Sequence, residues 1–404
     1  MPARIALLPE CYPLMHIAYI TASLSEHYGG PPRTVTGLAN AVSVLNHQVS
    51  HWAPTRANDK IVAEGDQANL FPVTFPMGWY RAPKFASGLA EAIERIDLLH
   101  IQEIWSYPQW CAAGLAAKHG KLFLVSPRGV LDQWRMQNRG KLRLLKKNVY
   151  LATLGRGLLK NAACLHALTD AEIAGFRSAG YRGPVTVLPN GIDLLPYQML
   201  PERDAAEQKW PQLKDRFVVL FLSRLSSEKG IDRLLRVWKE FRNFDPLLVL
   251  AGPDDKGYRA TVEGLIDQYG LKDRTLLTGP VFGQDKLQLI ARADLYTLPS
   301  HSEGFSMSVL ENLAAARPIL ISSACNFPEV AASGAGICVS DDAELKQGFK
   351  EFFNMSREDR FAMGEAGRRL VSEHYSWPVV ARKMIKVYQA ILRNETPPEH
   401  PSAD

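Results

Sequence analysis

Thirteen short apolar runs alternate with longer helical stretches along this 404-residue chain, and no other feature restricts its fold as strongly. In the first half the runs lie near residues 16–21, 48–53, 71–75, 97–101, 121–126, 163–168 and 185–188. In the second half they lie near 217–223, 247–251, 275–278, 294–298, 318–321 and 336–340. The run from Phe217 to Leu222 is apolar at every position, which is typical of strands covered on both faces in a parallel sheet. The pattern therefore predicts doubly wound α/β architecture.

A break between the two halves predicts two Rossmann-like domains. The segment Pro189–Asp193 has strong turn chemistry, and residues 194–215 contain three prolines, many charges and no apolar run. We expect an N-terminal domain at 15–195, a linker at 196–215, a second domain at 216–376, a C-terminal helix at 377–393 that packs back on the first domain, and a disordered tail at 394–404. Ligands of such domains bind at the carboxyl ends of the strands, so we expect the site in a cleft between the halves.

The first fourteen residues are rich in proline and precede the first convincing strand, which starts directly after Met15. They are too polar and too short for a signal peptide. Our hypothesis is that Met15 is the native start and that residues 1–14 are an upstream extension.

Charge and cysteine content exclude several classes of protein. The net charge of +5 is mild and does not indicate a nucleic-acid partner. The five cysteines are scattered and form no CxxC pair, which favours a reducing cytoplasm over a disulfide framework or a zinc site. No apolar run approaches the length of a membrane span.

Two carboxylates frame the segment that is most informative about function. Glu303 lies in a predicted turn after the strand near 294–298, and Glu311 lies two helical turns further on, on the same side. The helix start between them offers free N–H groups to an anion. A sugar nucleotide is such a ligand, since it has hydroxyls at both ends and a diphosphate in the middle. The alternative is that both glutamates lie on a solvated surface.

Two basic residues follow the strand near 217–223. Arg224 and Lys229 lie at its carboxyl end, on the predicted ligand side. An arginine fork and a lysine charge suit a diphosphate whose charge grows as it departs. The alternative is a solvated basic loop paired with Glu228.

A pair of glycines follows the first strand. Gly29 and Gly30 precede a helix expected from about Thr34 to Leu45, and they permit close approach of a phosphate to the backbone. The alternative is a plain β–α turn in which proline opens the helix. The chain has neither a Walker loop nor a G-x-G-x-x-G motif.

The segment from Trp134 to Lys160 has eight basic residues and no acidic one. Leucines and other apolar residues repeat beside the cations at helical spacing. Such a helix can lie on an anionic membrane surface, or its leucines can form the core face of a domain helix, and the sequence does not separate the two.

Histidines and acidic pairs do not suggest a metal. His100 is expected to be a hydrogen-bonded core residue, and His301 is only a weak ligand candidate. There is no HExxH motif, and Asp254 and Asp255 are adjacent rather than spaced as DxD. We therefore predict no obligatory metal site.

Together these features resemble family 4 of the nucleotide-sugar glycosyltransferases, which have the GT-B fold. The resemblance extends from Met15 to about Arg393. Its most specific parts are the Glu303–Glu311 stretch and the pair Arg224 and Lys229, supported by the segment Pro189–Asp193 and by the glycine pair.

The resemblance implies retaining transfer of a hexose-type sugar from a UDP- or GDP-linked donor, with no other obligatory cofactor. Arg224 and Lys229 would neutralise the donor diphosphate. Glu311 would bind the ribose hydroxyls, and Glu303 would hold hydroxyls of the donor sugar near the reacting carbon.

Backbone groups complete the implied donor site. Gly29 and Gly30 would approach the phosphates. Backbone N–H groups would face the donor at Phe305, Ser306, Met307 and Ser308. The departing diphosphate, rather than a protein side chain, would deprotonate the acceptor on the same face of the sugar.

The chain departs from the family at three places, one of which is Ala315–Arg317, where a Cys-Gly ending is common. Ser306 stands where many members have glycine. The segment Ser126–Gly129 stands where many carry a histidine, which makes Arg128 a candidate on the acceptor side. That form resembles a branch acting on bacterial surface polysaccharides, namely lipopolysaccharide, capsule or exopolysaccharide. The acceptor would then be a lipid-linked or polysaccharide intermediate, and the protein would be cytoplasmic or peripheral on the inner membrane face.

Other functions fit the same architecture. A sugar-nucleotide epimerase would convert its substrate without an acceptor, and a phosphorylase would need free phosphate. A non-catalytic sugar-nucleotide binding subunit would show no turnover.

Overall fold

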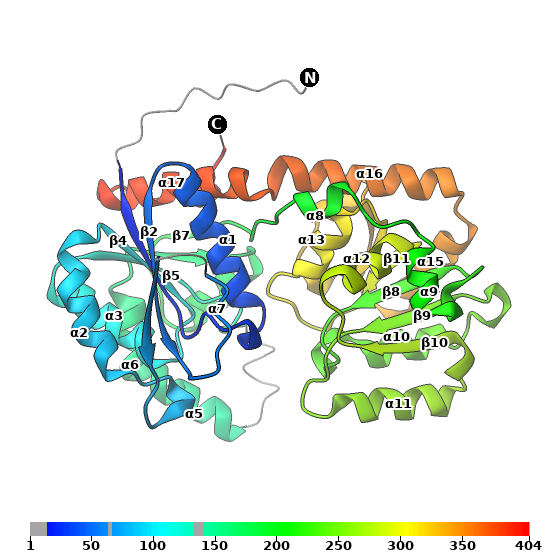
Figure 1. Ribbon diagram of the computed structural model, residues 1–404, viewed down its shortest axis with the longest axis horizontal. Coiled ribbons are helices and arrows are strands. Elements are labelled where there is room, and N and C mark those ends of the chain that lie inside the picture. Colours follow the sequence, from blue (N-terminus) through cyan, green and yellow to red (C-terminus); the bar gives the residue numbers. More distant parts are fainter. Residues whose placement is uncertain (1–13, 64–66, 133–140, 404) are drawn as a thin grey trace.

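A computed structural model describes residues 14–63, 67–132 and 141–403, with side chains from Leu144 onward in the last range. The proposed extension at 1–14 therefore lies, apart from Leu14, outside the described residues. The chain forms two α/β halves that lie side by side (Figure 1).

The first sheet has seven strands in the order β3-β2-β1-β4-β5-β6-β7. All its pairings are parallel. Its strands are β1 (His16–Ile20), β2 (Gln48–Thr55), β3 (Ala68–Pro72), β4 (Leu98–Gln102), β5 (Leu122–Ser126), β6 (Cys164–Ala167) and β7 (Val185–Val187).

The second sheet has six strands in the order β10-β9-β8-β11-β12-β13, again all parallel. They are β8 (Val218–Leu222), β9 (Leu247–Ala251), β10 (Thr275–Gly279), β11 (Leu295–Leu298), β12 (Ile319–Ser322) and β13 (Gly336–Val339). The thirteen predicted strands and the doubly wound architecture are thus confirmed. Both faces of each sheet are covered, and β8 and β9 are buried at every position.

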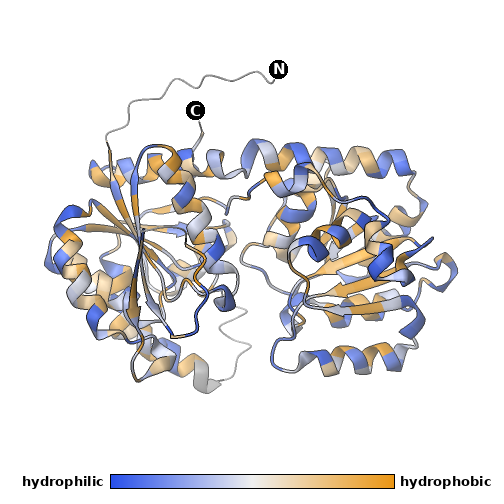
Figure 2. Ribbon diagram, in the orientation of Figure 1, coloured by the Kyte–Doolittle hydropathy of each residue, from blue (hydrophilic) through white to orange (hydrophobic). Residues whose placement is uncertain are grey.

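Helices cover the sheets and keep their polar residues outward, while the strands are largely apolar (Figure 2). In the first half they are α1 (Gly30–Val44), α2 (Pro83–Ala92), α3 (Tyr107–Lys118), α5 (Lys141–Ala152), α6 (Leu154–Lys160) and α7 (Ala171–Ser178). In the second half they are α10 (Ile231–Trp238), α11 (Tyr258–Tyr269), α12 (Gly283–Arg292), α13 (Met307–Ala314), α14 (Glu329–Ala332), α15 (Asp342–Asn354), α16 (Arg357–His374) and α17 (Trp377–Leu392).

Two expectations, the start of the first helix and the disorder of the tail, need correction. Helix α1 starts at Gly30 instead of near Thr34, because the two prolines that follow Gly30 fit the first helical turn. The expected linker contains two short helices, α8 (Leu195–Gln198) and α9 (Ala205–Lys209).

The expectation of a disordered tail is wrong for residues 394–403. The Val187 N–H donates to the Glu399 carbonyl at 2.6 Å, and the Thr186 hydroxyl donates to the Pro398 carbonyl at 2.8 Å. The tail therefore lies along β7, an edge strand whose free backbone groups it satisfies.

The strand order reverses once in each sheet. Loops that follow β1 and β4 leave the first sheet on either side of this point, and loops that follow β8 and β11 do so in the second. Ligands of doubly wound sheets bind at such a switch point. Gly29, Gly30, Arg224, Lys229 and Glu303 follow these strands, whereas Arg128 follows β5.

The chain crosses between the halves twice, and the two crossings are hydrogen-bonded to each other. The Ile192 N–H donates to the Tyr375 carbonyl at 2.8 Å, and the Trp377 N–H donates to the Ile192 carbonyl at 3.3 Å. After the second crossing, α17 returns over the first domain (Figure 1). It buries Val380, Met384 and other apolar residues against α1 and the first sheet.

Two glycines make room for the start of α17. A Cβ on Gly37 of α1 would lie 2.5 Å from the indole of Trp377, and a Cβ on Gly191 would lie 2.3 Å from the same ring. The indole is thus held between the helix and the first interdomain crossing.

A chain of buried hydrogen bonds runs through the first sheet, and each proton in it can be placed. His166 Nε2 lies 2.6 Å from the Leu188 carbonyl, so it must donate. Burial lowers the pKa of His166 to about 4, so the ring is neutral and its Nδ1 accepts from the Ser126 hydroxyl at 2.7 Å. Ser126 then accepts from His100 Nε2 at 2.6 Å.

The series of hydrogen bonds continues from His100 to α17. The His100 Nδ1 must accept, so the Tyr388 hydroxyl of α17 donates to it at 2.7 Å, and the Tyr19 hydroxyl of β1 donates to Tyr388 at 3.0 Å. Burial lowers the pKa of His100 as well. His100 is therefore a hydrogen-bonded core residue, as predicted, and it links α17 to the sheet.

We expect Gly37→Ala to lower the free energy of unfolding by about 1–3 kcal/mol, because the added methyl overpacks the Trp377 ring. Alanine in a helix is normally better than glycine by about 1 kcal/mol, so the sign is diagnostic. Urea unfolding would measure it. Gly114→Ala in α3, where a Cβ meets no atom within 4 Å, is the matched control and should stabilise. Destabilisation of equal size in both variants would contradict the packing argument.

Acidification should destabilise the protein through His166. Between its ordinary pKa of 6.5 and its folded pKa of about 4, the unfolded chain binds a proton that the folded protein does not. The free energy of unfolding should fall as the pH drops through this window, by up to about 3 kcal/mol at 1.36 kcal/mol per pH unit. Urea titrations from pH 7 to 4 would measure the slope. We expect a shallower slope in His166→Gln and an unchanged one in His27→Gln, which alters an exposed histidine.

Candidate active site

A buried ion pair joins the loops that follow β8 and β11. The Lys229 ammonium donates to Glu303 Oε1, and the side chains are only 8% and 5% exposed. The Ser300 hydroxyl donates to the same oxygen at 3.3 Å. Gly230 permits the approach, since it has a φ of 68° and its Cβ would lie 1.9 Å from the Pro299 carbonyl oxygen. Lys229 is therefore no solvated loop residue.

Three hydrogen bonds hold the backbone around Glu303. The Glu303 N–H donates to the Ala324 carbonyl at 3.1 Å, and the Asn326 side chain donates to the Glu303 carbonyl at 2.7 Å. The His301 N–H donates to the Glu228 carbonyl at 2.8 Å. These bonds come from the loops after β8 and β12, so the carboxylate sits in a fixed frame.

Ser306 caps the helix that follows. Its hydroxyl accepts from the Val309 N–H of α13 at 3.4 Å and lies 3.1 Å from the Ser308 hydroxyl, which in turn contacts the Tyr296 hydroxyl at 2.7 Å. The Ser306 oxygen thus accepts a hydrogen bond from one of the backbone N–H groups that lack a partner within the helix at its start. Phe305 and Met307 flank this cap, so their backbone groups lie at the start of α13.

Glu311 projects from α13 toward two partners that the sequence analysis missed. The Lys286 ammonium of α12 donates to Glu311 Oε1 at 2.7 Å. Burial and the nearby Glu311 carboxylate raise the pKa of Tyr197, which hydrogen-bonds this carboxylate. No local pattern could have linked these three residues, since Lys286 and Tyr197 lie on other helices.

Arg224 occupies a more open position than Lys229. Its guanidinium pairs with Asp255 at 2.8 Å, and its side chain is 49% exposed. The two cations after β8 are therefore unlike. One is buried against Glu303, and the other is accessible from solvent.

We use the word wall for the side of each domain that meets the other domain near Glu303. The wall of the first domain is built around Arg128. Its Nε–H donates to Gln102 at 2.7 Å, and one terminal nitrogen donates to Thr34 at 3.1 Å and Asn190 at 3.0 Å. Burial lowers the pKa of Arg128 to about 10, and the carboxylates of Glu103 and others oppose that shift, so the side chain is charged at neutral pH. The end of β4, helix α1 and the loop after β7 are thus tied to one cation.

The two walls touch each other at the Glu303 loop. The Ser302 hydroxyl donates to Asp132 at 3.1 Å, and the Thr169 hydroxyl donates to the Gly304 carbonyl at 3.5 Å. A Cβ on Gly304 would lie 3.4 Å from the Cα of Gly129. The loop after β11 therefore meets the loops after β5 and β6.

Gly29 and Gly30 follow β1, which is separated from β6 by two strands, β4 and β5, in the first sheet. Both are exposed, Gly29 has a φ of 108°, and a Cβ on either would meet no atom within 4 Å. The structure thus leaves open space around them at the start of α1.

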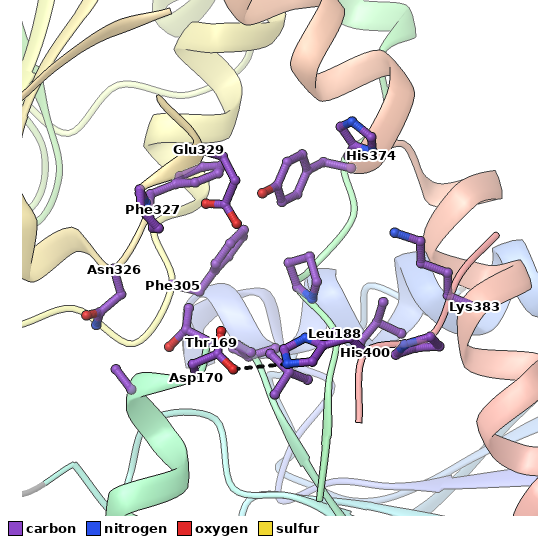
Figure 3. Close-up of a pocket in the computed structure, with 17 residues that line it drawn as sticks. Thr169, Asp170, Leu188, Phe305, Asn326, Phe327, Glu329, His374, Lys383 and His400 are labelled. Atoms are coloured by element: carbon purple, nitrogen blue, oxygen red, sulfur yellow. Dashed lines mark ion pairs between the residues drawn. The ribbon is translucent and has the colours of Figure 1, made fainter. Parts of the chain in front are cut away.

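A pocket of about 480 Å³ is lined by residues of both domains, among them Pro189 and Tyr375 beside the two crossings (Figure 3). Phe305 and Phe327 line it from the second domain, and Asp170 contacts His400 of the tail at 3.4 Å. Within the described part of the chain, the side chains close enough to share a metal ion are Asp170, Glu399 and His400, all of which are exposed and lie outside the loop after β11.

Two further carboxylates were missed from the sequence. Glu172 of α7 is buried near Gly304, and Glu103 follows β4. Each lacks a motif, and only the fold brings it to the wall. Glu103 directly follows a predicted strand, a positional signal that could have identified it.

Known proteins resemble both halves of the chain. The family described as "Glycosyl transferase 4-like domain" matches residues 29–191, and the family described as "Glycosyl transferases group 1" matches residues 202–370. A D-inositol 3-phosphate glycosyltransferase of Kineococcus radiotolerans is 26% identical over 230 residues, which are 52% of each chain. The match spans about half the length of this and other curated relatives.

Solved structures resemble the whole arrangement. Sucrose-phosphate synthase from Thermosynechococcus elongatus has a TM-score of 0.73 at 20% identity, over 94% of this chain and 100% of that one. HepE of Anabaena in complex with UDP-glucose has a TM-score of 0.72 at 18% identity, over 93% and 100%. The protein therefore joins a glycosyl transferase 4-like domain to a glycosyl transferases group 1 domain, and it belongs to the glycosyltransferases of GT-B fold.

Proposed function

We propose that the protein is a retaining glycosyltransferase of family 4. It transfers a hexose-type sugar from a UDP- or GDP-linked donor to a lipid-linked or polysaccharide acceptor. The observation that carries this proposal is the convergence of Lys229, Glu303 and Arg224 at the switch point of the second sheet, with Glu311 on the helix that follows. The UDP-glucose complex of a structurally similar protein supports a nucleotide sugar as donor.

Each residue has a role in this proposal. The exposed Arg224 turns from Asp255 to the diphosphate, and Lys229 adds a second positive charge beside it. Glu303, paired with Lys229, accepts hydrogen bonds from hydroxyls of the donor sugar. Glu311, oriented by Lys286, accepts hydrogen bonds from the ribose.

Backbone groups complete the donor contacts. Phe305, Ser306, Met307 and Ser308 present the start of α13 to the donor, where free N–H groups favour an anion. Gly29 and Gly30 leave room for its phosphates. Charge builds on the diphosphate as the sugar departs, so these groups bind the transition state more strongly than the ground state. The departing diphosphate takes the acceptor proton on the same face.

The acceptor is proposed to be an intermediate of bacterial surface polysaccharide, such as lipopolysaccharide, capsule or exopolysaccharide. Arg128 supports the acceptor side, because in the opposite wall it ties the end of β4 to the loop after β7. We place the reaction in the cytoplasm, at the inner face of the membrane.

An exposed surface on α5 supports attachment to that membrane. Leu145 and Val149, which repeat at helical spacing, are 59% and 54% exposed, with cations of Lys146 and Arg156 nearby in sequence. Residues 134–140 of the basic segment lie outside the described residues. In the part that the structure describes, no helix is long and apolar enough to span a bilayer. Apolar residues beside cations suit the surface of an anionic membrane.

A screen of nucleotide sugars against the purified protein tests the proposal, because donor hydrolysis and thermal stabilisation need no acceptor. Binding of a UDP- or GDP-sugar with slow release of nucleoside diphosphate is the expected result. Release of an epimer without acceptor would instead indicate an epimerase, and binding without turnover a non-catalytic subunit. NMR of the released sugar distinguishes retention from inversion.

Glu311→Ala should weaken binding of the nucleotide sugar tenfold to over a hundredfold, since a hydrogen bond to a charged group is worth about 1.5–3 kcal/mol. Calorimetric titration would measure it. Glu263→Ala on α11, which also breaks an ion pair, is the control and should bind as the parent does. Parent-like affinity of Glu311→Ala would refute the ribose contact.

Anionic vesicles should pellet the protein at low salt, and Leu145→Ser with Val149→Ser should reduce binding about tenfold or more, since burying an aliphatic side chain is worth about 1.5 kcal/mol. Phe361→Ser removes a side chain of similar exposure from the second domain and should have no effect. Equal binding to neutral vesicles, or none at low salt, would contradict membrane attachment.

A further inference from the structure

Glu103 combines a strained backbone with a half-buried carboxylate at the edge of the first sheet. It follows β4 directly and has a φ of 63°, a region that residues other than glycine and asparagine rarely occupy. Its N–H donates to the Ser126 carbonyl at 2.8 Å, which fixes the conformation. Strain of this kind is concentrated at binding and catalytic sites.

The partners of Glu103 place it beside the glycine pair. The Tyr28 hydroxyl donates to Glu103 Oε2 at 2.8 Å, and Tyr28 directly precedes Gly29. The ring of Tyr28 packs edge-on against Tyr80 at 5.8 Å. A carboxylate has about four acceptor positions, so one phenol leaves most of its capacity unused. Burial raises the pKa of Glu103, while Tyr28 and Arg128 oppose that shift.

Glu103 and Glu303 occupy equivalent places in the two domains. Strand β4 lies next to β1 where the first sheet reverses its order, and β11 lies next to β8 where the second does. Each glutamate follows the fourth strand of its sheet and bonds a side chain from the loop after the first strand, Tyr28 or Lys229. Each switch point therefore carries one carboxylate.

The two glutamates belong to walls that face each other. The charge of Arg128 acts on Glu103, and Gly129, the next residue, approaches Gly304 to within 3.4 Å of its Cβ position. A ligand held by Glu103 would therefore lie across from the loop that holds the donor sugar.

We propose that Glu103, presented by Tyr28, binds hydroxyl groups of the acceptor at the switch point of the first sheet. This rests on the proposed function and narrows its acceptor to a neutral, sugar-like group at the reacting end. A carboxylate accepts hydrogen bonds from vicinal hydroxyls and repels phosphate or carboxylate. Charge on the acceptor would then lie away from the hydroxyl that is glycosylated.

The strain offers a variant that separates binding from folding. Glu103→Gly removes the carboxylate and also suits a φ of 63°, so we expect its melting temperature to equal or exceed that of the parent. If Glu103 had only a structural role, Glu103→Gly would raise the melting temperature without any loss of activity. Glu103→Gln keeps the shape and removes the charge. Glu26→Gln alters an exposed carboxylate on the Tyr28 loop and is the control.

The assay is release of nucleoside diphosphate from the accepted nucleotide sugar, with and without tens of millimolar glucose, mannose, galactose or their octyl glycosides. We expect at least one of these acceptors to stimulate release by the parent. In both Glu103 variants its KM should rise tenfold or more, and this change should exceed any change in release without acceptor. The control should match the parent in both respects.

Two results would overturn the proposal. One is a parent-like acceptor KM in Glu103→Gly. The other is a parent that hydrolyses the donor but responds to none of these hydroxyl acceptors. Absence of donor hydrolysis in the parent would count against the glycosyltransferase function itself, so the two failures are distinguishable.

Discussion

The pairing of Lys229 with Glu303 is the constraint on which the arrangement of the second domain depends. Two opposite charges withdrawn from water are stable only with close mutual contact and further hydrogen bonds. The surrounding loops supply both. Gly230 lets the β8 loop reach the end of β11, Ser300 bonds the carboxylate, and Asn326 holds the backbone of Glu303. Loss of either charge would leave the other buried and uncompensated, so the frame and the charge pair maintain each other.

The first domain uses neutral groups for a comparable purpose. Its buried chain of donors runs in one direction, from Tyr19 through Tyr388, His100 and Ser126 to His166. The direction is fixed at one end by a backbone carbonyl, which can only accept. Because Tyr388 belongs to α17, this network stabilises the return of the C-terminal helix to the first sheet. Charge pairing thus joins loops of the second domain, whereas oriented dipoles join strands of the first sheet to α17.

Much of the fold was readable from the sequence because buried parallel strands are apolar at every position. The positions of Arg224 and Glu303 after strand ends, and of Glu311 on the helix that follows, could be predicted from those strands. The side chains that these residues contact could not be predicted in this way. Lys229 and Glu303 are separated by 74 residues, and Lys286 reaches Glu311 from a different helix. Such contacts depend on how loops of different strands meet, which local periodicity does not encode. The ordered tail was missed for a similar reason, since its polar composition indicated disorder while an edge strand provided backbone partners.

The two hydrogen-bonded crossings between the domains have a mechanical meaning. A single linker would permit bending, twisting and sliding of one domain against the other. Here the segments around Ile192 and Tyr375 run side by side, and the indole of Trp377 is clamped next to them by Gly37 and Gly191. Two parallel attachments suppress twist and translation and leave rotation about the line through them as the soft motion. Rotation about this line would separate Ser302 from Asp132 and Gly304 from Thr169, which lie on the opposite wall.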